Sequence, residues 1–126
     1  MLFGIALGGA LGSVARFAIG HYGARHNERF PWATLLINVA GSFLLGLLVR
    51  WLPRSALTPE MGFALTVGFC GGFTTFSTFS VEVARLIEGG AYGRAAAYAT
   101  ASMVLSLAAT FAGFVVGRGA SGGAAG

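Results

Sequence analysis

Residues 61–87 read MGFALTVGFCGGFTTFSTFSVEVARLI, an apolar run whose two charged residues, Glu82 and Arg85, lie near its end. A helix that crosses a membrane needs about 20 mostly apolar residues, at a rise of about 1.5 Å each. The run therefore has the length of a membrane-spanning helix. Its middle is unusual, because Gly71 and Gly72 come shortly before two β-branched threonines, which makes a poor helix interior. We predict that this helix is broken at the two glycines, in the middle of the membrane.

A break at that depth would free backbone carbonyl groups where water cannot reach them. Non-helical backbone is tolerated there only inside protein or beside a cavity, and freed carbonyl oxygens suit a hard cation such as Na⁺. After the break, Phe76 and Phe79 are predicted to share one helix face, interleaved with the hydroxyl residues Ser77, Thr78 and Ser80. Rings that face lipid and rings that face a polar pathway are both compatible with this pattern.

Three further runs have spanning length, over residues 2–22, 33–52 and 91–117. The composition agrees with a membrane protein: 56% of the residues are hydrophobic, only 10% are charged, and the mean hydropathy is +0.77. A soluble domain usually carries about 25% charged residues, because its surface must face water. We predict one all-α membrane domain of four transmembrane helices over residues 1–117, followed by a disordered tail over residues 118–126.

Polar side chains recur at a spacing of four on the second and fourth runs, which places them along one face of each helix. Structural hydrogen bonds and a polar pathway through the membrane both explain such stripes. The first run carries glycines at that spacing, which favours close helix packing, and then an arginine that either reaches the membrane surface or serves at a pore mouth. These residues are Thr34, Asn38 and Ser42 on the second run, Tyr98, Ser102, Ser106 and Thr110 on the fourth, and Gly4, Gly8, Gly12 and Arg16 on the first.

The charges and the reactive side chains argue against several function classes. The net charge of +4 comes from arginines scattered singly, whereas nucleic-acid binding needs a clustered basic patch, so we expect no nucleic-acid partner. No nucleophile–base pair or metal cluster is apparent, so we expect no enzyme. A proton-coupled transporter would need a carboxylate within the membrane. The only candidate is Glu82, for which an ion pair with Arg85 is the easier interpretation.

The arginines also bear on topology, because arginine in short loops favours the cytoplasmic side. Four are predicted on one side of the membrane and three on the other. This near balance favours insertion in both orientations, with antiparallel pairing of chains, while a fixed orientation set by the first two loop arginines stays open. They are Arg25, Arg29, Arg85 and Arg94 on one side, and Arg50, Arg54 and Arg118 on the other.

At these residues the chain resembles the CrcB/Fluc family of fluoride channels. The most specific match is GFCGGFTTFSTF at residues 68–79, and the resemblance covers nearly the whole chain. Matching residues lie on all four runs. They are Gly8, Gly9, Gly12 and Arg16 on the first, Thr34, Asn38, Gly41, Ser42 and Phe43 on the second, and Tyr98, Ser102 and Ser106 on the fourth.

The resemblance implies a passive, fluoride-selective channel that exports fluoride across the cell (inner or plasma) membrane, built as a dual-topology antiparallel homodimer. It implies that Phe76 and Phe79 face the anion, that Asn38 donates to it and that Arg16 lies near a vestibule. It also implies a structural Na⁺ that is not transported, held by the backbone carbonyls of Gly71 and Thr74 of both subunits. The remaining polar residues of the implied fluoride pathway are Thr34, Ser77, Thr78, Tyr98, Ser102 and Ser106. A purely structural membrane protein is the other alternative.

Overall fold

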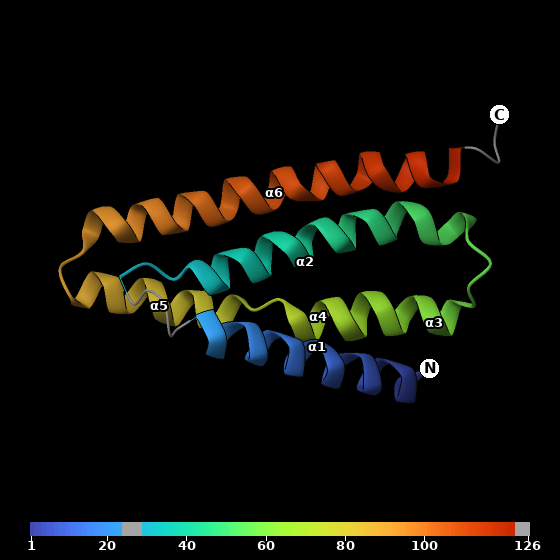
Figure 1. Cartoon of the computed structure of the whole chain (residues 1–126), viewed down its shortest axis with the longest axis horizontal. Coiled ribbons are helices and arrows are strands. Elements are labelled where there is room, and N and C mark those ends of the chain that lie inside the picture. The colour runs from blue at the N-terminus through green and yellow to red at the C-terminus, as the bar shows by residue number, and fades with distance from the viewer. Residues whose placement is uncertain (24–28, 123–126) are drawn as a thin grey trace.

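The computed structural model describes residues 1–23 and 29–122, with side chains as far as residue 120. Within this part all regular secondary structure is helical, and four segments are long and apolar enough to cross a membrane. Figure 1 shows the segments lying lengthwise beside one another, with the chain passing back and forth. The prediction of an all-α protein with four membrane-spanning helices is therefore confirmed. The segments are α1 (Leu2–Gly23), α2 (Trp32–Trp51) with the 3-10 turn η1 (Leu52–Arg54), the run Pro59–Glu88, and α6 (Tyr92–Gly122).

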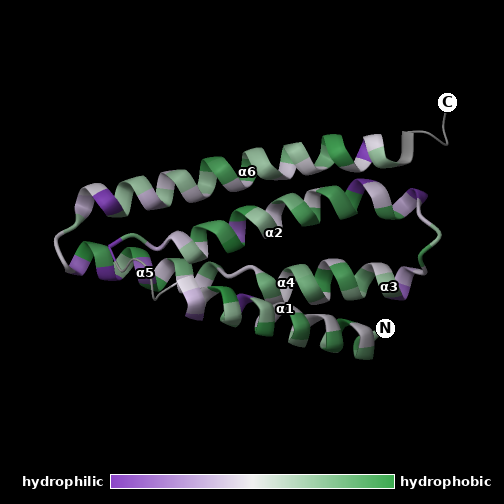
Figure 2. Ribbon diagram, viewed as in Figure 1, coloured by the Kyte–Doolittle hydropathy of each residue, from purple (hydrophilic) through white to green (hydrophobic). Residues whose placement is uncertain are grey.

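Many large apolar side chains lie on the outer faces of the helices, and Figure 2 shows green, hydrophobic residues recurring along the segments. Large side chains of α1 are almost fully exposed: Leu2 is 82%, Phe3 81% and Phe17 70% exposed. Large apolar side chains are exposed on α6 too, among them Met103 and Phe111. An apolar surface of this extent is stable against lipid and unfavourable in water. The fold is that of a multi-pass membrane protein.

The helix ends follow local sequence signals. The third segment begins with Pro59 in the first turn, where its missing N–H does no harm, and the Thr58 side chain accepts a hydrogen bond from the N–H of Met61. The turn between α5 and α6 contains Gly90 at φ +77°, a left-handed conformation that favours glycine. Residues 118–122, assigned by the sequence to the tail, continue α6 to Gly122, and residues 123–126 lie outside the described residues.

Helices α2 and α6 form the most extensive contact, and glycines bring their backbones together. A Cβ atom on Gly46 would overlap the carbonyl oxygen of Thr110, and one on Gly113 would overlap that of Phe43. Such close approach maximises van der Waals contact between helices, which is the main attraction available where lipid removes the hydrophobic effect. These glycines are therefore required by packing.

The glycine stripe of α1 packs in the same way against the third segment. A Cβ atom on Gly8 would overlap the carbonyl oxygen of Ala64, and one on Gly12 would overlap that of Phe69. The contact is reciprocal, since a Cβ atom on Gly72 would overlap the carbonyl oxygen of Gly9. The packing role predicted for the glycines of the first run is thus confirmed for Gly8 and Gly12.

The third segment is not one continuous helix. It consists of α3 (Pro59–Phe63), the π-helix η2 (Ala64–Cys70), α4 (Gly71–Phe73) and α5 (Phe76–Glu88). The two residues between α4 and α5, Thr74 and Thr75, are extended, with φ −79°, ψ 157° and φ −151°, ψ 116°. Figure 1 shows this interruption as a thin link between the two ribbons.

The position predicted for the break was therefore wrong. Gly71 is helical, with φ −64° and ψ −39°, and Gly72 lies within α4. The physical reason is that Gly72 serves the close contact with α1 and not a change of chain direction. The chain leaves the helix only at Thr74 and Thr75, where another helix supplies partners for the backbone.

Candidate functional site

The interruption is held by Asn38, a half-buried residue of α2. Its side-chain N–H donates to the carbonyl of Thr75 at 3.0 Å, and its Oδ1 accepts from the N–H of Thr75 at 2.8 Å. The two bonds replace those that a continuous helix would give this residue. The amide has a second N–H, for which no described residue is a partner. Asn38 thus shapes the backbone of the interruption through two of its polar groups.

Thr75 then organises the start of α5. Its Oγ1 accepts a hydrogen bond from the N–H of Thr78 at 3.2 Å, which is a helix N-cap, and lies 3.1 Å from the Thr78 hydroxyl and 3.4 Å from that of Ser77. Three hydroxyl groups therefore meet at one helix end. Sequence reasoning missed Thr75, although a threonine directly before a helical segment is a typical N-cap residue.

Three aromatic rings continue from this helix end. The ring centroids of Phe76 and Phe79 lie 5.5 Å apart, and those of Phe79 and Tyr98, on α6, lie 5.1 Å apart. Tyr98 is completely buried, whereas Phe76 is 78% exposed. The row of rings thus runs from the interior of the chain to its surface, at Phe76.

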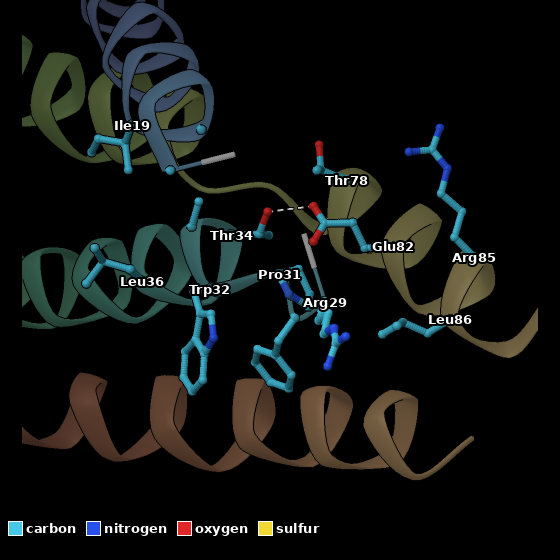
Figure 3. Close-up of a pocket in the computed structure, with 14 residues that line it drawn as sticks. Ile19, Arg29, Pro31, Trp32, Thr34, Leu36, Thr78, Glu82, Arg85 and Leu86 are labelled. Atoms are coloured by element: carbon cyan, nitrogen blue, oxygen red, sulfur yellow. Dashed lines mark hydrogen bonds between the residues drawn. The ribbon is translucent and has the colours of Figure 1, made fainter. Parts of the chain in front are cut away.

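Glu82 joins the predicted polar residues of α2 and α6. The Thr34 hydroxyl donates to its Oε1 at 2.6 Å, and the Tyr98 hydroxyl donates to its Oε2 at 3.2 Å. Figure 3 shows the carboxylate turned toward Thr34, while Arg85 extends away from it. The expected ion pair between Glu82 and Arg85 is therefore wrong, because two hydroxyl donors on neighbouring helices satisfy the carboxylate. The spacing of four from Thr78, which puts both on one face of α5, was the signal that could have found Glu82.

An open pocket of about 710 Å³ lies against this cluster (Figure 3). Thr34, Thr78 and Glu82 contribute its polar wall, and Arg29 and Arg85 also line it. Arg94 donates from Nη1 to the carbonyl of Arg29 at 3.1 Å. Two arginines against one glutamate give these walls a positive balance, which raises the local concentration of anions.

The hydroxyl stripe of α6 divides into structural and free members. Thr110 donates to the carbonyl of Ser106 at 3.0 Å, one turn back, so its hydroxyl is satisfied by its own helix. Ser102 is buried, and its hydroxyl has no hydrogen-bond partner among the described residues. Ser106 is half-buried. Ser102 therefore offers an unused donor and acceptor beyond Tyr98 on the same helix face.

The carbonyl groups at the end of α4 fall into two sets. That of Cys70 accepts from the N–H and the hydroxyl of Thr74, at 3.0 and 2.9 Å, and that of Gly72 accepts from Nε of Arg16 at 3.1 Å. The carbonyls of Gly71 and Thr74, in contrast, accept no hydrogen bond from the described residues. Gly71 is also exposed, with open space beside it. These two oxygens are free to bind a hard cation.

Fold and site together define a helical multi-pass membrane protein with hydroxyl, amide and aromatic groups gathered at an interrupted helix. The profile of the family described as "CrcB-like protein, Camphor Resistance (CrcB)" matches residues 3–114. The chain belongs to this CrcB family, which confirms the recognition made from sequence.

Among its relatives, a protein of Agrobacterium fabrum named "Fluoride-specific ion channel FluC" is 48% identical over 116 residues, which cover 90% of this chain and 93% of the relative. Proteins of the same name from Rhodospirillum centenum and Thermus thermophilus are 46% identical over 125 residues and 45% identical over 114 residues. The match with the Rhodospirillum centenum protein covers 94% of this chain and 95% of the relative. The match with the Thermus thermophilus protein covers 90% of each. The relatives are named as channels, which agrees with the prediction that the protein is not an enzyme.

Proposed function

We propose that this protein is a fluoride-selective passive channel that exports fluoride from the cytoplasm through the cell membrane. The choice of fluoride as the ion is supported by the names of the relatives, which are fluoride-specific ion channels. The observation that carries the proposal is the start of α5, where neutral donors and aromatic rings meet beside an interrupted helix. A permeating anion needs weak and repeated binding groups rather than one strong cationic site, since conduction requires release as well as binding.

The start of α5 suits an anion for three physical reasons. A helix N-terminus carries a partial positive charge and N–H groups without intrahelical partners. The hydroxyls of Ser77 and Thr78 add donors that can replace the strongly held water of fluoride. The rings of Phe76 and Phe79 have positive edges, which attract an anion while the ring faces repel it. In the proposal these groups bind fluoride together with the second N–H of Asn38.

The polar residues around the pocket extend the pathway. Arg29 and Arg85 would collect anions. Thr34 and Tyr98 each donate their one hydroxyl hydrogen to Glu82, so either would bind fluoride only by exchanging the carboxylate for the ion. Ser102 and Ser106 would continue the hydroxyl stripe along α6. A carboxylate beside an anion pathway opposes the ion by Coulomb repulsion, so we expect the two arginines to offset Glu82.

The end of α4 suits a structural Na⁺. A helix C-terminus is partially negative, and the carbonyls of Gly71 and Thr74 accept no hydrogen bond from described residues. Two carbonyls make too few ligands for Na⁺ alone, so we propose that a second subunit supplies the same pair. The ion would hold the subunits together without being transported.

An antiparallel, dual-topology homodimer supplies such a second pair. Phe76 and Gly71 are exposed on the single chain, and a second copy would enclose both. The near-even split of the loop arginines supports insertion in both orientations. The interruption lies near the middle of Pro59–Glu88, so we place it at mid-membrane depth, where two inverted copies meet at equal depth.

Passive flow is sufficient for export. Fluoride enters cells as neutral HF, which dissociates in the less acidic cytoplasm, so the anion accumulates inside. A negative-inside potential then drives the anion outward with about 2.3 kcal/mol per charge per 100 mV. No coupling to protons or ATP is required.

Efflux from liposomes tests the proposal. Liposomes that contain only this protein are loaded with potassium fluoride or potassium chloride, and a potassium ionophore removes the opposing potential. We expect rapid fluoride efflux and little chloride efflux. Equal release of both ions would overturn the selectivity, and uphill fluoride uptake driven by a pH gradient would point to proton coupling through Glu82.

A further inference from the structure

Two side chains of α1 converge on a single carbonyl of the third segment. Nε of Arg16 donates to the carbonyl oxygen of Gly72 at 3.1 Å, and the Ser13 hydroxyl donates to the same oxygen at 3.5 Å. Both side chains are half-buried. Arg16 therefore does more than extend toward the membrane surface, because its guanidinium is directed at the backbone of another helix.

The Gly72 carbonyl lies next to the proposed cation site. Gly72 lies between Gly71 and Thr74, the residues whose carbonyls accept no hydrogen bond from described residues. In a continuous helix the Gly72 carbonyl would accept from the N–H four residues later, and the interruption at Thr74 and Thr75 prevents this. Without Arg16 it would keep only the long bond from Ser13, and without both side chains it would be a third free oxygen in the same turn.

The backbone of Gly72 is also held by its packing. A Cβ atom there would overlap the carbonyl oxygen of Gly9, so α1 lies directly against this peptide. Direct backbone contact from Gly9 and a directional bond from Arg16 thus act on one residue. Together they fix the orientation of the last turn of α4 relative to α1.

We propose that Arg16 is a positioning residue of the cation site, which keeps the Gly72 carbonyl turned toward α1 and so leaves only the Gly71 and Thr74 carbonyls for the ion. The inference rests on the proposed Na⁺ site. Cation affinity depends on the number and orientation of the oxygen ligands, so rotation of one peptide in this turn would weaken the site. Arginine suits the task because its planar guanidinium holds a fixed direction, which a lysine ammonium does not.

The change in Na⁺ binding after removal of Arg16 distinguishes a positioning role from a role through charge alone and from a role in fold stability alone. If Arg16 acted only through its charge, its removal would relieve repulsion of the cation and strengthen Na⁺ binding. If Arg16 only stabilised the fold, its removal would lower the unfolding temperature equally at every Na⁺ concentration. Positioning predicts weaker Na⁺ binding in spite of the lost repulsion.

The test measures the unfolding temperature of the purified protein in detergent against Na⁺ concentration, with choline holding the ionic strength constant. Arg16→Met removes donor and charge, and Arg16→Lys keeps the charge but not the planar donor. We expect both variants to raise the Na⁺ concentration for half-maximal stabilisation, Arg16→Met by about tenfold, which corresponds to one lost charge-assisted hydrogen bond. Ser13→Ala should raise it slightly, since its bond is long.

Arg50→Gln is the matched control, because Arg50 lies over the ring of Phe114, 4.6 Å from its centroid, near the end of α2. It removes the same charge away from the interruption and should leave the Na⁺ midpoint unchanged. An unchanged or lowered midpoint in both Arg16 variants would overturn the inference alone. If the wild-type protein showed no response to Na⁺, the proposed cation site would fail and this inference with it, while fluoride efflux would remain a separate result.

Discussion

Asn38 holds both backbone groups of Thr75, with its Oδ1 2.8 Å from the Thr75 nitrogen and its Nδ2 3.0 Å from the Thr75 oxygen. The bonds identify the two ends of the amide, since a backbone N–H must meet the oxygen and a carbonyl must meet the nitrogen. One side chain of α2 thus supplies the hydrogen bonds that a continuous helix would give Thr75 in the third segment. Helix α5 can begin immediately afterwards, with its N-terminus at the proposed pathway.

Replacing Asn38 by leucine should therefore destabilise the fold. The variant keeps the approximate volume but leaves the N–H and the carbonyl of Thr75 unpaired, which costs about 2–4 kcal/mol in total. Thermal unfolding in detergent measures the loss, and Ser42→Ala, one turn further along α2, is the control. If Asn38→Leu unfolds at the wild-type temperature, the two hydrogen bonds of Asn38 do not stabilise the interruption.

Replacing Phe76 or Phe79 by isoleucine should reduce fluoride flux while the protein stays folded. Isoleucine keeps an apolar side chain but lacks the positive ring edge, and the loss of one such interaction corresponds to about tenfold in rate. Fluoride efflux from liposomes is the measurement. Phe3→Ile, on the exposed face of α1, is the matched control and should conduct normally. Normal flux in both the Phe76 and the Phe79 variant would show that the rings do not belong to the fluoride pathway.

The glycines of α6 should respond to alanine according to their surroundings. A Cβ atom on Gly113 would overlap the carbonyl of Phe43, whereas one on Gly93 meets open space. Gly113→Ala should therefore destabilise the protein by about 1–3 kcal/mol through overpacking. Gly93→Ala should be neutral, or stabilising by up to about 1 kcal/mol, because glycine weakens a helix. Equal unfolding temperatures for the two variants would contradict direct backbone contact between α2 and α6.

The near balance of loop arginines predicts dual insertion. A reporter fused after residue 126 should be found on both faces of the membrane in comparable amounts. Two or three arginines added to one loop should shift the reporter to one side, because positive charge in short loops sets orientation. A native sequence that places the reporter on one side only would rule out dual topology.

Several features of the site could be read from sequence because they depend on spacing along one helix. Thr34 and Asn38 share a face of α2, and the rings of Phe76 and Phe79 come together on α5 as their spacing predicts. Glu82 was assigned the wrong partner, since Arg85 is near in sequence whereas Thr34 and Tyr98 reach the carboxylate from other helices.

Hydropathy and helix period were sufficient to predict four membrane-spanning helices and the packing stripe of α1, because length, polarity and spacing are properties of each segment by itself. The place where the third segment leaves the helix was decided by tertiary structure. Glycine lowers helix propensity at Gly71 and Gly72, yet close packing against α1 keeps Gly72 helical. Thr74 and Thr75 have a higher helix propensity than glycine, yet they are extended. The reason is that Asn38 of α2 forms hydrogen bonds with the N–H and the carbonyl of Thr75, which replace those of a helix. Backbone groups in a membrane must find partners, and only the packing of the helices determines which partners lie within reach.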